Sequence, residues 1–98
     1  MNNQTFDNST WANGQPSIDI DPYDYSASGF NALIDAISKK YSFGPYEIVR
    51  GFDEYITTLI INQEEVCFHM DNWTCSIAFI TEELRDEVLA YLKLTYSS

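Results

Sequence analysis

The stretch Tyr46–Ile80, YEIVRGFDEYITTLIINQEEVCFHMDNWTCSIAFI, decides the fold. It consists of runs of β-branched and aromatic residues, which favour strands, separated by short polar or acidic breaks, which favour turns. The breaks are Asp53-Glu54, Asn62-Gln63-Glu64 and Asp71-Asn72. The pattern therefore predicts an antiparallel meander of four strands, over residues 46–52, 55–61, 65–70 and 73–80.

The Asp71-Asn72 break suits a two-residue hairpin, because Asp and Asn tolerate positive φ. That turn would place Met70 opposite Trp73, Phe68 opposite Cys75 and Val66 opposite Ile77. Side chains alternate along a strand, so one face of this hairpin is apolar: Val66, Phe68, Met70, Trp73, Cys75, Ile77 and Phe79. The two cysteines, Cys67 and Cys75, then point to opposite faces, and we expect no disulfide between them. The other sheet face is expected to stay at least partly open, with Val49, Ile56, Thr58, Ile60, His69, Thr74 and Ser76.

Two amphipathic helices flank the predicted strands. The first has an apolar stripe of Phe30, Leu33, Ile34, Ile37 and Tyr41, with Ser26 or Ser28 as its N-cap and Gly44-Pro45 after its end. The second starts after the N-cap Thr81 and carries a stripe of Leu84, Val88, Tyr91 and Leu92. Its exposed side is expected to hold Arg85, Asp86, Glu87 and Lys93. Both stripes need an apolar partner, so we expect both helices on the apolar face of the sheet.

The chain before the first helix divides into two parts. Residues 1–16 are polar and without periodicity, which predicts a flexible tail whose candidate anchors are Phe6 and Trp11. Residues 17–25 alternate Ile with Asp, which predicts an edge strand that ends at Asp21-Pro22. The expected architecture is thus one α+β domain over residues 17–98, in the order helix, four strands, helix.

The net charge is −10, from fifteen Asp and Glu against five Lys and Arg. A negative field disfavours contact with nucleic acid and with anionic membranes, and it favours a basic protein partner. No apolar run reaches the about 20 residues of a membrane span, and the start of the chain lacks the pattern of a secretory signal. We therefore expect a cytoplasmic protein.

No catalytic, cofactor or metal site is predicted. His69 is the sole histidine, and although Cys67 could approach it, nothing in the sequence lowers the pKa of that thiol or supplies an oxyanion site. Asp19, Asp21 and Asp24 are ligands of the type that Ca²⁺ takes, but they lack the spaced calcium-binding loop. A non-enzymatic function is the expectation that follows.

Acidic residues mixed with tyrosines are typical of a surface that binds a basic partner. The candidate partner-binding residues are Asp19, Asp21, Tyr23, Asp24, Tyr25, Asp53, Glu54, Glu64 and Glu65. The leading hypothesis is a small inhibitor, immunity or phage anti-defence protein that masks a basic surface, such as a nucleic-acid-binding one, in the manner of a DNA mimic. The alternative is a structural or adaptor module that forms a homodimer through its open sheet face or an edge strand.

Overall fold

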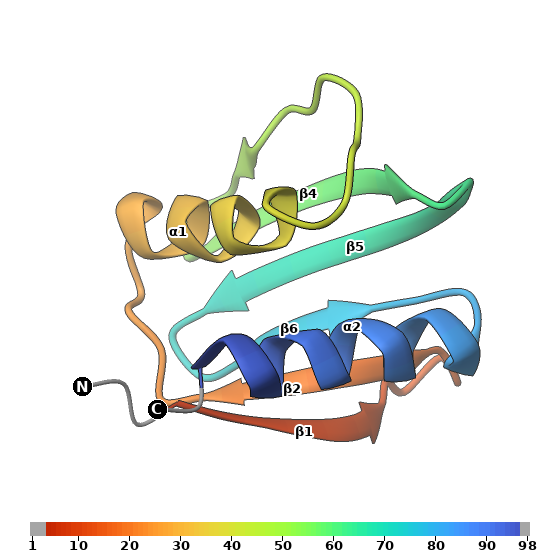
Figure 1. Cartoon of the computed structure of the whole chain (residues 1–98). Helices are drawn as coiled ribbons and strands as arrows, with labels where there is room; N and C mark the ends of the chain where they lie inside the picture. Colours follow the sequence, from red (N-terminus) through yellow and green to blue (C-terminus); the bar gives the residue numbers. More distant parts are fainter. Residues whose placement is uncertain (1–3, 97–98) are drawn as a thin grey trace.

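The computed structural model describes residues 4–96. Its elements are β1 (Thr5–Thr10), β2 (Pro16–Asp21), α1 (Ala27–Ser38), β3 (Val49–Arg50), β4 (Glu54–Ile61), β5 (Glu64–Asp71), β6 (Cys75–Ala78) and α2 (Glu82–Tyr96). The strands form one antiparallel sheet in the order β1-β2-β6-β5-β4-β3. Both helices lie on the same face of this sheet (Figure 1). The predicted α+β class with two helices on one face is confirmed.

The prediction of four strands and a flexible tail was wrong, because the described chain before α1 forms a hairpin of two more strands. Thr5–Thr10 form the edge strand β1, and β2 lies inside the sheet between β1 and β6. The hairpin is held by a few buried side chains: Phe6 lies opposite Ile20 and packs against Tyr96 of α2, with ring centroids 5.1 Å apart. Residues 1–3 of the predicted tail lie outside the described residues.

The predicted register of the last hairpin is displaced by two residues. Met70 lies opposite Cys75 and Phe68 opposite Ile77, so residues 71–74 form the connection. The cause is the side chain of Asp71, whose Oδ1 accepts hydrogen bonds from the backbone N–H groups of Trp73 and Thr74 at 2.8 and 2.7 Å. A shift of two keeps every side chain on its face, so the predicted core face survives, except that Trp73 leaves it and is 78% exposed.

The two cysteines lie on opposite faces, as predicted, and both are free thiols. Cys75 is buried beneath the helices, whereas Cys67 is half-buried on the other side of the sheet. The strand β4 turns into β5 through Asn62 and Gln63, whose φ angles of 52° and 69° are those of a tight two-residue hairpin.

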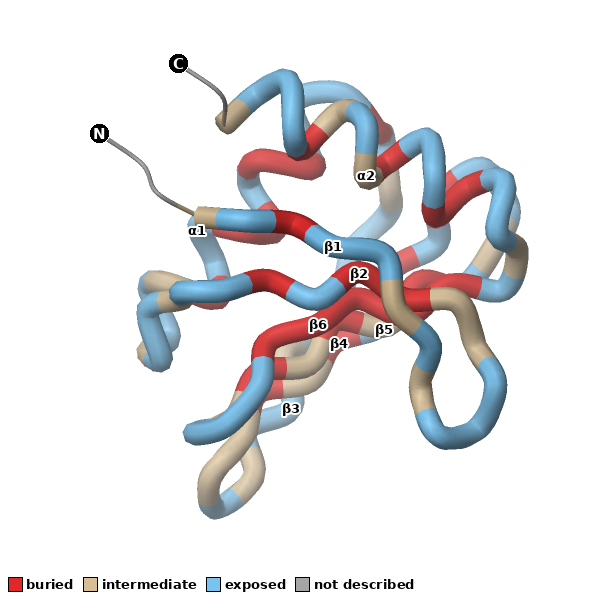
Figure 2. The backbone as a smooth tube through the Cα atoms, turned by 90° about the horizontal axis from the view of Figure 1, so that it is seen from below, coloured by how far each residue is buried: buried red, intermediate tan, exposed pale blue. Residues whose placement is uncertain are grey.

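The helices begin at the predicted caps. The hydroxyl of Ser26 accepts a hydrogen bond from the Gly29 N–H, and that of Thr81 accepts one from the Leu84 N–H. The helices also contact each other, since the Tyr91 hydroxyl of α2 donates to the Ala36 carbonyl of α1 at 2.7 Å. Figure 2 shows the resulting core as buried positions along β2, β6 and one side of α2.

The placement of Arg85 on the exposed side of the last helix was wrong. Its side chain is buried, and its guanidinium donates to the backbone carbonyls of Ser9 and Ser17 at 3.1 and 3.4 Å and to the Asp86 carboxylate. These bonds tie α2 to the two strands of the N-terminal hairpin. Arg85 is buried because that hairpin, which the sequence did not reveal, lies beneath it.

Candidate functional site: the open face of the sheet

The sheet face opposite the helices is called the open face here. Every second side chain of each strand points to it. Asp7 follows the buried Phe6, and Asp19 lies between the buried Ile18 and Ile20, so both carboxylates point to the open face. The same alternation places six acidic side chains there: Asp7, Asp19, Asp21, Glu54, Glu65 and Asp71.

The five Lys and Arg residues of the chain lie elsewhere. Lys39 and Lys40 follow α1, and Arg85 and Lys93 belong to α2. The Arg50 guanidinium lies 5.6 Å from the ring centroid of Tyr55, a buried residue on the helix side of the sheet. The sheet therefore separates the charges: its open face holds carboxylates and a histidine without a lysine or arginine.

The carboxylates of Asp7 and Asp19 come from positions directly opposite each other on β1 and β2. Like charges in such cross-strand positions repel each other and lower the stability of a sheet. In the part of the chain that the structure describes, neither carboxylate accepts a hydrogen bond or pairs with a cation. The repulsion between them is thus left uncompensated.

The loop between β1 and β2 places an aromatic side chain over this face. The loop is closed by backbone hydrogen bonds from the Trp11 N–H to Gln15 and from the Gly14 N–H to Trp11, and Gly14 has a φ of 91°, a conformation that favours glycine. The Trp11 indole N–H then donates to the Ser76 hydroxyl of β6 at 3.0 Å. The loop is therefore closed by its own bonds and attached to the sheet by its tryptophan.

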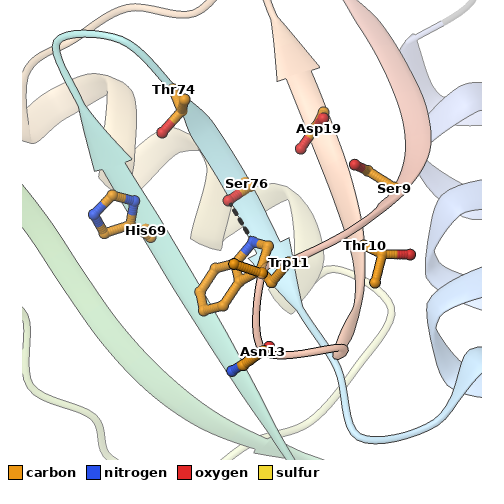
Figure 3. Close-up of a pocket in the computed structure, with 9 residues that line it drawn as sticks. Ser9, Thr10, Trp11, Asn13, Asp19, His69, Thr74 and Ser76 are labelled. Atoms are coloured by element: carbon orange, nitrogen blue, oxygen red, sulfur yellow. Dashed lines mark hydrogen bonds between the residues drawn. The ribbon is translucent and has the colours of Figure 1, made fainter.

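A groove of about 560 Å³ lies beside this indole (Figure 3). It is lined by the loop on one side and by open-face residues on the other, among them Asp19, His69, Thr74 and Ser76. The indole meets His69 edge to face, with ring centroids 6.4 Å apart at an angle of 84°. The groove thus combines a fixed aromatic ring, an unpaired carboxylate and several hydroxyl groups.

Next to the groove, His69 lies between two acidic side chains. Its Nε2 is 2.9 Å from Glu54 Oε1 and 3.9 Å from Asp71 Oδ2. Burial alone raises the pKa of Asp71, but the hydrogen bonds from the Trp73 and Thr74 amides and the charge of His69 outweigh it, and the pKa falls below its ordinary value of 3.8. Asp71 is therefore held in its charged form.

The other chemically reactive group of this face is unsuited to nucleophilic catalysis. Burial raises the pKa of the Cys67 thiol, the opposite of the change that activates a cysteine. The His69 Nε2 contacts the Glu54 carboxylate. The arrangement of Cys67 and His69 is therefore not that of a nucleophile and its base.

The predicted partner-binding residues are distributed over several surfaces. Asp19, Asp21, Glu54 and Glu65 lie on the open face, as described above. The Glu64 carboxylate accepts a hydrogen bond of 2.8 Å from the Thr81 hydroxyl, which ties it to the start of α2.

The remaining predicted residues lie in the loops before α1 and before β4. Tyr23 packs against the core and donates its hydroxyl to the Asp71 carbonyl, and Tyr25 packs against Tyr55 with ring centroids 5.8 Å apart. Asp24 is exposed in the loop before α1, and Asp53 is half-buried in the turn before β4. The segment Asp19–Tyr25 therefore divides between the open face and the covered side.

Two features of this face were missed by the sequence reasoning, Asp7 and the position of Trp11. Both lie in the segment expected to be a tail. Trp11 was noted only as a candidate anchor, and its place above β6 depends on the loop closure and on a hydroxyl 65 positions along the chain.

The open face also carries large apolar side chains, on β3 and β4. Val49 of β3 and Ile60 of β4 are 61% and 50% exposed, and Ile56 lies between them on the same face. Phe52, in the turn between β3 and β4, is fully exposed. The open face thus carries acidic side chains on β1, β2, β5 and at the Glu54 end of β4, and an apolar group of Val49, Ile56 and Ile60 on β3 and β4.

Neither helix found in residues 4–96 combines the length and the apolar character that crossing a membrane requires. Within the same residues, no three His, Cys, Asp or Glu side chains are grouped so that they could hold a metal ion. No protein-family model matches the chain, and no curated protein or solved structure is significantly similar to it.

Proposed function

We propose that this chain is a small, non-enzymatic acidic protein that binds a basic surface of a partner protein with its open face and thereby masks that surface. The observation that carries the proposal is the separation of charge across the sheet. Six carboxylates lie on the open face, and all five Lys and Arg residues lie off it. Such a face attracts a positively charged surface and repels nucleic acid.

The size of the open face also supports a protein partner. Six strands about 4.8 Å apart, with two to eight residues each at about 3.3 Å per residue, give a face of roughly 540 Å². A standard protein–protein interface buries about 800 Å² per partner. The open face and its rim are therefore of the right scale for one protein interface.

Charge alone gives rapid association, but stable interfaces also need buried aromatic or apolar anchors. The open face offers Trp11 and the apolar side chains of Val49, Ile56 and Ile60. A partner with a basic surface beside an apolar patch fits this combination of acidic and apolar side chains. The proposed role is an inhibitor, immunity or anti-defence protein, acting in the cytoplasm on a protein such as a nuclease whose basic surface binds nucleic acid.

The test compares two triple variants with the same change of charge. One neutralises the open face (Asp7→Asn, Asp19→Asn, Glu65→Gln), and the other neutralises exposed acids outside that face (Asp24→Asn, Asp35→Asn, Glu83→Gln). Immobilised wild-type chain should capture a basic protein from the host lysate at low salt, and the second variant should still capture it. Equal capture by the open-face variant, or capture indifferent to salt, would contradict the proposal.

A second candidate function, self-association, is favoured by the exposed apolar end of the face at the edge strand β3. Three large apolar side chains are exposed near the edge strand β3, namely Val49, Phe52 and Ile60. Exposed apolar side chains beside a strand edge are a combination found at interfaces. Sedimentation at micromolar concentration distinguishes the two functions. A dimer that Ile60→Lys converts to a monomer would favour self-association, and a monomeric wild type would remove it.

A further inference from the structure

The groove beside Trp11 allows the partner's contact residue to be named, an inference that rests on the proposed function. The groove lies on the open face, and Trp11, Asp19, His69, Thr74 and Ser76 line it (Figure 3). Its volume of about 560 Å³ is more than one amino-acid side chain fills. It is thus a shallow groove, open to solvent, that can hold a side chain of the partner.

The aromatic wall of the groove is fixed before any partner arrives. The Trp11 N–H is bonded to Ser76, the indole and the His69 ring meet in a T-shaped pair, and the loop that carries Trp11 is closed by two backbone hydrogen bonds. A fixed aromatic ring attracts cations through its negative face, and little side-chain entropy remains to be lost on binding. The wall therefore favours a cationic group.

The acidic wall points to the same kind of group. Asp19 lines the groove and is exposed, and its carboxylate has no hydrogen-bond or ion-pair partner among residues 4–96. Asp7, directly opposite on β1, adds a second negative charge nearby. A cation that binds here would pair with Asp19 and relieve its repulsion with Asp7.

We propose that this groove takes an arginine side chain of the basic partner, with the guanidinium against Trp11 and paired with the Asp19 carboxylate. Arginine fits better than lysine because its planar group packs on an aromatic ring and donates two parallel hydrogen bonds to a carboxylate. The hydroxyl groups at the groove, those of Ser9, Thr74 and Ser76, offer acceptors for its remaining N–H groups.

The experiment uses the full chain, a nona-arginine peptide as the probe and a nona-lysine peptide of equal charge as its control, at about 0.15 M ionic strength where long-range attraction is screened. The chain has two tryptophans, so its NMR spectrum has two indole N–H signals, which Trp73→Phe assigns. We expect the arginine peptide to shift the Trp11 signal and to bind about fivefold more tightly than the lysine peptide.

A matched pair of variants tests the acidic wall. Asp19→Asn should weaken binding of the arginine peptide by about fivefold, whereas Asp35→Asn, which removes the same charge from exposed α1, should change it less than twofold. Asp19 is exposed and repelled by Asp7, so its replacement should leave the fold intact. Equal effects of the two variants would overturn the groove proposal.

The remaining outcomes separate this inference from the proposed function. Binding of both peptides with equal affinity, or with a shift of the Trp73 signal alone, overturns the groove and leaves charge-driven binding standing. Binding of neither peptide, even at low salt, counts against both. A shift of the Trp11 signal with protein concentration alone would show that a second copy of the chain occupies the groove, which also overturns the proposal.

Discussion

The indole N–H of Trp11 donates a hydrogen bond of 3.0 Å to the hydroxyl of Ser76, which follows it by 65 positions in the chain. Trp11 belongs to the loop of the N-terminal hairpin, and Ser76 belongs to β6, the strand on which that hairpin docks. The bond lies on the open face, outside the hydrophobic core. It fixes both the loop and one wall of the groove.

Replacing Ser76 by Ala should loosen this loop without disturbing the core. A hydrogen bond of this kind contributes about 1 kcal/mol to the free energy of unfolding, so we expect a loss of that size. Urea unfolding measures the loss, and hydrogen exchange of the Trp11 indole should become faster. Ser9→Ala, on the same face, is the control, because among residues 4–96 Ser9 is bonded through its backbone carbonyl, which the substitution keeps, and not through its hydroxyl. A Ser76→Ala variant with unchanged indole exchange would contradict the prediction.

Neutralising Asp19 should make the protein more stable. Because Asp7 lies directly opposite, Asp19→Asn removes a like-charge repulsion, and we expect a gain of about 0.2–1 kcal/mol in the free energy of unfolding. The gain should shrink in 1 M salt, where the Debye length is about 3 Å. Thermal unfolding at two salt concentrations measures it, with Asp35→Asn as the control. If the two variants gain equally, the cross-strand repulsion is not the cause.

Asp71 should make stability depend on pH in acid. Its pKa in the folded protein lies below its ordinary 3.8, so its contribution is complete above that value and is lost as pH falls through the lower, folded pKa. Asp71→Asn keeps a side-chain oxygen that accepts hydrogen bonds from the Trp73 and Thr74 amides, but this side chain carries no charge at any pH. We expect the wild type to exceed this variant in stability at neutral pH and to lose that advantage below about pH 4.

The measurement is the urea midpoint between pH 2 and 7. Asp71→Ala, which removes the acceptor altogether, should cost about 1 kcal/mol more than Asp71→Asn at neutral pH. A wild type and an Asp71→Asn variant whose curves run parallel through the whole range would refute the role of the charge.

Arg85 should matter far more than the other cation of α2. Arg85→Leu leaves the carbonyls of Ser9 and Ser17 without their buried donor, and we expect a loss of about 2 kcal/mol in the free energy of unfolding. Lys93→Leu removes the same charge from an exposed position of the same helix and should change stability by less than about 0.5 kcal/mol. If urea unfolding shows the same loss of stability for Arg85→Leu and Lys93→Leu, the buried hydrogen bonds of Arg85 do not contribute to the free energy of unfolding.

The two cysteines should differ in reactivity although both are free. Burial, with the nearby charges of Asp19 and Asp71, raises the pKa of Cys75 to about 12, so its thiolate is scarce at neutral pH and shielded from solvent. Cys67 is half-buried, and burial raises its pKa as well. Mass spectrometry after iodoacetamide treatment at pH 8 should show slow labelling of Cys67 and labelling of Cys75 only in urea. Rapid labelling of Cys75 in the native protein would be inconsistent with the core described here.

The parts of the fold that follow from local pattern were predictable. A short stretch of sequence is enough to predict the apolar stripes of α1 and α2 and their caps, Ser26 and Thr81. The same is true of the strands β4 and β5. The alternation along β4 and β5 also identified the two faces of the sheet, because a strand presents its side chains with period two.

The parts that depend on distant partners were not predictable. Strand β1 contains a single buried apolar residue, Phe6, and forms because β2 pairs with it and α2 covers it. The turn after β5 is set by the Asp71 side chain, which accepts hydrogen bonds from the Trp73 and Thr74 amides in place of the two-residue turn that Asp71-Asn72 suggested. The net charge was plain from composition, but the absence of lysine and arginine from a face that holds six carboxylates required the true positions of Asp7 and Arg50.

The sheet order has a consequence for how the chain is made. The hairpin of β1 and β2 leaves the ribosome before the other strands, yet β2 pairs with β6, where Ile18 lies opposite Ile77, 59 positions later. Until β6 emerges, the inner edge of β2 has no neighbour, and its two buried isoleucines have no finished core to enter. We therefore expect the nascent domain to stay protease-sensitive until β6 has emerged, and then to fold as one unit.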